Sequence, residues 1–150
     1  MSATSGNARP RLLLVEDNPA DVRLTVEVFG EGTLQPRIDV VSDGIEALQY
    51  LRGEPPFAAA HVPDLILLDL NMPRMDGREL LAVLKADRAL ARIPVVVLTT
   101  SSAPTDVAHC RLLRAESVIS KPVDLEGFQR VVRAIERFWL SMSNVRPAES

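Results

Sequence analysis

The chain has 150 residues and a net charge of −3, and its apolar share of 47% and charged share of 25% are those of an ordinary globular protein. This length is enough for one domain with a hydrophobic core. Twenty acidic residues against seventeen basic ones do not predict a nucleic-acid surface, which is usually basic. No apolar run approaches the roughly 18 residues of a membrane span, so the sequence predicts no membrane partner.

The two ends of the chain are predicted to lie outside the folded domain. Residues 1–10 lack the apolar segment of a secretory signal and are predicted to be a disordered lead-in. Residues 11–140 form the predicted domain, and residues 141–150 form a tail. The one cysteine, Cys110, cannot form an internal disulfide, which favours a reducing cytoplasm.

Four apolar runs and a weaker fifth predict the β-strands. In chain order they are Leu12–Val15, Ile38–Val41, Leu65–Leu68, Val95–Leu98 and Ser117–Ser120. Continuous apolar runs are typical of strands covered on both faces, as in a parallel sheet. The second and fifth runs are more polar, which favours positions at the two edges of the sheet.

Helical patterns separate these strands. Asn18 and Pro19 predict the cap and first residue of a helix, although the alternating apolar residues over 22–28 would also fit a strand. The cap and the topology favour the helix. Asp43 and Glu46 resemble a capping box ahead of a second helix. Three further helices are predicted over Gly77–Ala86, over about Pro104–Leu113 and from Asp124 onward.

The order of elements is strand then helix, five times over. This alternation predicts an α/β fold, a doubly wound parallel sheet with helices on both faces and right-handed crossovers. Polar second and fifth strands fit the flavodoxin-like order 2-1-3-4-5 best. Ligands of such sheets bind at the carboxyl ends of the strands, where the first and third strands meet.

Chemically useful side chains follow those strand ends. Glu16 and Asp17 come after the first strand and Asp69 ends the third, while Thr99 and Lys121 end the fourth and fifth. Clustered acids repel one another unless a cation joins them, and oxygen ligands of this kind suit Mg²⁺. We therefore predict that Asp69 is a nucleophile that forms an acyl phosphate. Mg²⁺ held by the other two acids would offset charge on the phosphoryl group, whose oxygens Thr99 and Lys121 would contact.

Four motifs resemble the response-regulator receiver domain of the chemotaxis-regulator type: "LLLVEDN", "DLILLDLNMPRMDG", "IPVVVLTT" and "SKP". The resemblance covers nearly the whole chain and implies a receiver fold. It implies that Asp69 is the phosphoacceptor and that the main-chain carbonyl of Asn71 is a further metal ligand. It also implies that Met72-Pro73 and Asp76-Gly77 shape the following loop, and that the bond before Pro122 is cis. A receiver is not a conventional enzyme, but it assists its own phosphorylation and dephosphorylation.

One subgroup of the family is more similar than the rest. "EDNPADVRL", "LTTS", the long loop before the third strand and a late "FW" resemble the single-domain regulators that accompany bacterial phytochromes. This implies a phosphorelay in which a histidine kinase, plausibly a bacterial phytochrome, is the partner. Two positions depart from the family pattern. Val118 replaces the usual aromatic residue three positions before the lysine, and Arg114 stands where glycine is common.

Two other functions compete with the phosphoacceptor. An aspartate-nucleophile phosphatase would use the same metal, but it typically has a second acid two residues after the nucleophile, where this chain has Asn71. It also needs a cap for which the chain has no spare residues. A binding module that no longer reacts predicts a broken acidic set, whereas the set is complete. No DNA-binding segment follows the domain, so the sequence predicts no nucleic-acid partner.

The sequence also predicts a homodimer through the fourth helix, the fifth strand and the fifth helix. The segment Pro104–Leu113 carries more apolar positions, Cys110 and Leu112 among them, than one buried stripe needs. Phe138 and Trp139 are neighbours on a helix and cannot both face the sheet, which predicts that one ring is exposed. The alternative is that this ring packs under the C-terminal tail. The family resemblance favours the dimer.

Overall fold

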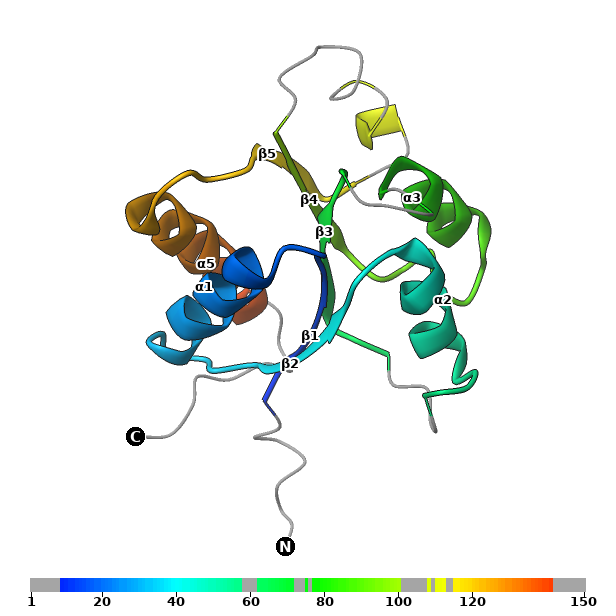
Figure 1. Ribbon diagram of the computed structural model, residues 1–150, viewed down its shortest axis with the longest axis horizontal. Coiled ribbons are helices and arrows are strands. Elements are labelled where there is room, and N and C mark those ends of the chain that lie inside the picture. The colour runs from blue at the N-terminus through cyan, green and yellow to red at the C-terminus, as the bar shows by residue number, and fades with distance from the viewer. Residues whose placement is uncertain are drawn as a thin grey trace, which may run out of the picture.

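A computed structural model describes residues 9–57, 62–71, 75, 77–100, 108, 110–112 and 115–141 (Figure 1). The elements are β1 (Arg11–Val15), α1 (Pro19–Gly30), β2 (Arg37–Val41), α2 (Gly44–Arg52), β3 (Leu65–Asp69), α3 (Gly77–Ala86), β4 (Val95–Thr99), β5 (Ser117–Ser120) and α5 (Leu125–Leu140). All strand pairs are parallel and the order is β2-β1-β3-β4-β5. The predicted fold class and strand order are confirmed.

The strands differ in burial as their composition predicts. Every residue of β3 and β4 is buried, whereas β2 and β5, at the two edges, are mostly exposed or half-buried. Four of the five strands are one residue longer than their apolar runs. For β3 and β4 the additional residue is Asp69 or Thr99, so both side chains belong to the sheet itself. The regular strand backbone therefore fixes the positions of these two candidate site residues.

Polar caps fix where the helices begin. The Asn18 side chain accepts hydrogen bonds from the amides of Ala20 (2.9 Å) and Asp21 (3.2 Å), as an N-cap should. Asp43 likewise accepts from the amide of Glu46 at 2.9 Å. The Glu46 carboxylate accepts from the amide of Ser42, one residue before the cap. The second helix thus has a variant of the predicted capping box.

The helices cover both faces of the sheet, with α1 and α5 on one face and α2 and α3 on the other (Figure 1). Alternate strand residues feed a separate hydrophobic cluster on each face. Leu13 and Ile66 point toward α2 and α3, and Leu12 and Leu67 toward α1 and α5. Each such buried leucine stabilises the fold by about 1.5–3 kcal/mol. These two clusters hold the strand ends, and the site on them, in place.

The predicted exposed aromatic ring is not found on α5. Trp139 is fully buried and its ring centroid lies 6.1 Å from that of Phe29 on α1. Phe138 is half-buried and packs against the same cluster. The expectation that one of the two rings is exposed was wrong, because α5 packs against α1 as well as the sheet and its buried face is wide enough for both rings.

Only part of the predicted fourth helix lies within the described residues. Residues 108 and 110–112 are helical, and the remainder of the prediction over 104–113 falls outside the described ranges. Cys110 is fully buried in the cluster beneath α2 and α3, whereas Leu112 is 81% exposed. Cys110 is thus a core residue and no part of an interface. Within the described ranges, no helix is both long and apolar enough to span a membrane.

Candidate metal and phosphoryl site

Three carboxylates meet at the carboxyl ends of β1 and β3. These strands are neighbours, with Val15 opposite Leu68, so the residues that follow them, Glu16 and Asp69, lie side by side. One oxygen from each of Glu16, Asp17 and Asp69 lies within 4.8 Å of the others. Glu16 and Asp69 are both 4% exposed, whereas Asp17 faces solvent. The predicted cluster is therefore present, with one side open to water.

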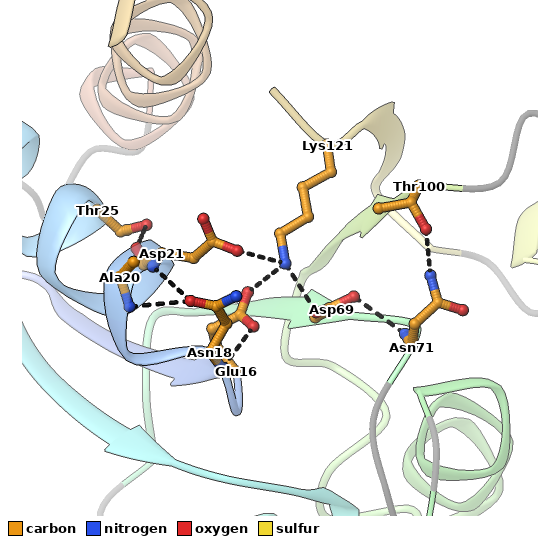
Figure 2. Close-up of polar contacts among 9 residues, drawn as sticks. All are labelled: Glu16, Asn18, Ala20, Asp21, Thr25, Asp69, Asn71, Thr100 and Lys121. Atoms are coloured by element: carbon orange, nitrogen blue, oxygen red, sulfur yellow. Dashed lines mark hydrogen bonds and ion pairs between the residues drawn. The ribbon is translucent and has the colours of Figure 1, made fainter. Parts of the chain in front are cut away.

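Lys121 crosses this cluster from the end of β5 (Figure 2). Its Nζ lies 2.8 Å from Glu16 Oε1 and 2.9 Å from Asp69 Oδ2. A third carboxylate, Asp21 of α1, lies 2.9 Å from the same nitrogen. The main-chain amide of Lys121 donates to the carbonyl of Thr99 at 2.8 Å, which ties the lysine to the end of β4. One ammonium thus joins the ends of β1, β3 and β5 and the first turn of α1, which are far apart in the sequence.

Burial and charge shift the pKa values of two of these groups. Burial raises the pKa of the Glu16 carboxyl to about 7, although the hydrogen bonds from Lys121 and from the Asn18 amide oppose the shift. Burial alone would lower the pKa of Lys121. Its hydrogen bonds to three carboxylates outweigh burial and raise the pKa of Lys121 above its usual value. The lysine therefore stays positively charged, but its single charge does not offset the three carboxylates around it.

Asn71 and Thr100 complete the edge beside Asp69 (Figure 2). The amide of Asn71 donates to Asp69 Oδ1 at 3.0 Å, so each oxygen of Asp69 has its own partner. The side-chain nitrogen of Asn71 donates to Thr100 Oγ1 at 2.8 Å and joins the ends of β3 and β4. Thr99, the last residue of β4, is 2% exposed. The structure thus brings together all the predicted site positions.

At Gly77, the first residue of α3, the backbone packs closely against the end of β3. A Cβ atom there would lie 2.6 Å from Leu70 Cα and 2.7 Å from the carbonyl oxygen of Asp69. The amide of Gly77 also donates to the carbonyl of Leu70 at 3.0 Å. Only glycine lets α3 begin this close to the end of β3. Met72-Pro73 and Asp76, which were expected to shape the same loop, lie outside the described residues.

Two expectations about the site need amendment. Asp21 was not predicted; it lies in the first turn of α1, which begins just after Glu16 and Asp17. The bond before Pro122 was expected to be cis. Among the described residues the cis bond is Pro55–Pro56, so the bond before Pro122 is trans, the form that X–Pro bonds intrinsically favour.

Comparison with known proteins identifies the family. The family model for the response regulator receiver domain matches residues 12–133. The chain belongs to the response regulator receiver family. It is therefore not a member of a conventional enzyme family.

Its similar relatives include phytochrome response regulators. Response regulator Rcp1 of Synechocystis sp. is 42% identical over 129 residues, which cover 86% of this chain and 88% of Rcp1. The crystal structure of the phosphorylated cyanobacterial phytochrome response regulator RcpA has a TM-score of 0.83 and 48% identity, covering 89% of this chain and 96% of RcpA. The Mn²⁺-bound structure of Rcp1 has a TM-score of 0.81 and 39% identity, covering 93% and 99%. The receiver is thus homologous to Rcp1 and RcpA.

The acidic cluster of this receiver fits a divalent cation. All its side-chain ligands are oxygens, the donors that Mg²⁺ prefers, and the exposed Asp17 leaves a side open for the waters that Mg²⁺ retains. A compact group of carboxylates with one ammonium among them keeps a net negative charge, which a bound cation would offset. Mg²⁺ is therefore the cofactor that the donor set fits.

Proposed function

We propose that Asp69 is the phosphoacceptor of this receiver. The observation that carries the proposal is the position of its carboxylate: buried, at a strand end, within the acidic cluster and 2.9 Å from the Lys121 ammonium. A carboxylate oxygen of Asp69 attacks the phosphorus of a phosphohistidine, and the new P–O bond replaces the P–N bond. The imidazole nitrogen leaves with the electron pair of that bond and takes up a proton.

The surrounding residues serve the same step. Glu16, Asp17 and Asp69, with the main-chain carbonyl of Asn71, would hold Mg²⁺, which supplies positive charge beside the phosphoryl oxygens when it is bound. Lys121 contacts a phosphoryl oxygen because its ammonium already lies against Asp69. The Thr99 hydroxyl, at the neighbouring strand end, donates to another. By holding these groups in place the receiver, which we assign to residues 11–140, assists its own phosphorylation and dephosphorylation.

Incubation with acetyl phosphate and Mg²⁺ tests this function against its two competitors. We expect a stoichiometric adduct of one phosphoryl group per chain, seen by intact mass spectrometry. Multiple turnover of a phosphorylated metabolite would instead support an aspartate-nucleophile phosphatase. No adduct under any condition would support a binding module that no longer reacts.

We further propose that the donor is the phosphohistidine of a cytoplasmic histidine kinase of the bacterial phytochrome type. The support is the similarity to RcpA, which is a phytochrome response regulator, and to Rcp1. Phosphotransfer from a purified phytochrome kinase, compared with an unrelated histidine kinase, tests the pairing. Equal transfer from both kinases would contradict a phytochrome partner.

The signal leaves the receiver through the face formed by the fourth helix, β5 and α5, where we propose that two copies pair. Leu112 is 81% exposed, and Ile119 of β5 and Phe138 of α5 are half-buried beside a cavity of about 90 Å³. Exposed and half-buried apolar groups of this kind are common at interfaces. Val118 adds a small β-branched side chain where the family usually has a ring, so no large aromatic rotation accompanies the signal.

A further inference from the structure

The Lys121 ammonium has three carboxylate partners, of which only two belong to the proposed metal set. Glu16 and Asp69 belong to the proposed metal set, whereas Asp21 does not. Asp21 reaches the ammonium from the α1 side, and Asp69 reaches it from β3 (Figure 2). All three distances, 2.8–2.9 Å, are those of charge-assisted hydrogen bonds.

The backbone around Asp21 is fixed by two local hydrogen bonds. Its amide donates to the Asn18 cap at 3.2 Å, and its carbonyl accepts from the buried Thr25 hydroxyl at 2.7 Å. Asp21 thus lies in the first turn of α1, where an acidic side chain also suits the helix dipole. The side chain therefore extends toward the lysine from a fixed backbone position.

We propose that Asp21 is a positioning residue for Lys121, which holds the ammonium at the site when Glu16 and Asp69 turn to a metal ion. This inference rests on the proposed function. The Lys121 side chain is 11% exposed, so an ammonium that lost its partners would be left desolvated and unpaired. Asp21 gives it a partner that metal binding does not remove. Lys121 thereby stays beside Asp69, where the phosphoryl group arrives.

The alternative is that the Asp21–Lys121 contact is an ordinary surface ion pair. Such pairs are worth little because water screens both charges. Here the Asp21 side chain is 27% exposed and that of Lys121 is 11% exposed, so screening is incomplete on the lysine side. A surface pair would therefore give a coupling well below the fivefold expected of a positioning residue.

A double-mutant cycle tests the role without measuring activity. Asp21→Asn, Lys121→Met and the double variant are unfolded in urea, once with chelator and once with saturating Mg²⁺. We expect the two substitutions to couple by at least about fivefold in the unfolding equilibrium under both conditions. Glu27→Gln is the matched control, because Glu27 is exposed on the same helix and loses the same charge. Its coupling to Lys121→Met should stay below about twofold.

The condition with Mg²⁺ decides the outcome. Coupling that is present with chelator and lost with Mg²⁺, or absent under both conditions, overturns the proposal. The Lys121 ammonium signal in ¹⁵N-lysine NMR spectra gives a second reading. With Mg²⁺ it should be retained in the wild type and in Glu27→Gln, and be shifted or lost in Asp21→Asn. An unchanged signal in Asp21→Asn would overturn the proposal as well.

Failure of this inference is separable from failure of the proposed function. The same preparations are incubated with acetyl phosphate, and labelling of Asp69 is measured. Labelled wild-type protein without coupling in Mg²⁺ overturns the role of Asp21 alone. Unlabelled wild-type protein overturns the phosphoacceptor function and, with it, the role of Asp21 in that function.

Discussion

Charge at the level of single residues explains why Asp69 can lie at the end of a buried strand. Its carboxylate would be costly there without partners, and it has two: the Asn71 amide and the Lys121 ammonium. Glu16 shares the same ammonium, and burial raises the pKa of Glu16 to about 7. The site thus holds more acid than one lysine can offset, which prepares it for a divalent cation.

Substitution of Asp17 should lower the affinity of the site for that cation with the least disturbance of the fold. It is exposed and belongs to the cluster, so Asp17→Ala removes a proposed ligand without opening a cavity. Loss of groups that only support metal ligands already costs about 10–100-fold in affinity, so we expect a loss of at least about tenfold for Mg²⁺. Isothermal titration calorimetry measures it, with Glu27→Gln as the control for net charge. Wild-type affinity in Asp17→Ala would show that the metal does not use this carboxylate.

At the level of elements, close approaches between a strand and a helix hold the site. The start of α3 is pressed against the end of β3 at Gly77, and Gly77→Ala would force Leu70 or Asp69 to move. We expect this substitution to destabilise the receiver by about 1–3 kcal/mol and to slow labelling of Asp69. Gly30→Ala is the matched control, because a Cβ there meets no atom within 4 Å. Urea unfolding measures both, and equal stability of the two variants would contradict the close contact.

Helix α2 is tied to the edge strand β2 by the Tyr50 hydroxyl, which donates to the Asp39 carboxylate. Burial, together with that hydrogen bond and the charge of Asp39, raises the pKa of Tyr50 above its usual value. The folded state therefore keeps the phenol proton at a pH where the unfolded state loses it. This contribution to stability is present below about pH 10 and declines as the pH rises further.

Tyr50→Phe should remove both the hydrogen bond and this pH dependence. We expect a loss of about 1–2 kcal/mol at pH 7, less than for a fully buried pair because Asp39 is exposed. The wild type and the variant should converge in stability as the pH rises above about 10, since only the wild type loses this contribution. Chemical denaturation at pH 7, 9 and 11 measures the difference. A constant difference across that range would contradict the raised pKa.

For the whole molecule, the sequence predicts the strands, their order and the positions of the candidate site residues, because these follow from composition and hydrophobic pattern. The strands are evident because β1, β3 and β4 are covered on both faces and are apolar except for one residue each. The site residues are evident because parallel strands bring their carboxyl ends to one edge. Asp21 was missed because its role depends on Lys121, which only the folded chain brings within 2.9 Å. The burial of Trp139 depends equally on the docking of α5 against α1.

The proposed dimer is also a property of the whole molecule. Arg111 is exposed near the proposed face, whereas Arg133 lines a cavity on the α1 side of α5, with Val28 and Gly32. We expect Arg111→Glu to change the dimer dissociation constant by about three- to tenfold, and Arg133→Glu to leave it unchanged. Sedimentation at micromolar concentration, with and without phosphorylation, measures it. A monomer in both states would end the proposal, and a dimer sensitive to Arg133 alone would move the interface to the α1 side.

The most direct test of the central claim is to locate the phosphoryl group on the chain. Wild-type protein, Asp69→Asn and the surface control Glu126→Gln are treated with acetyl phosphate and Mg²⁺, and the adduct is mapped by mass spectrometry. An amide cannot replace the carboxylate as nucleophile, so we expect a single adduct on Asp69 in the wild type and in Glu126→Gln, and none in Asp69→Asn. An adduct of unchanged yield in Asp69→Asn would show that another residue receives the phosphoryl group.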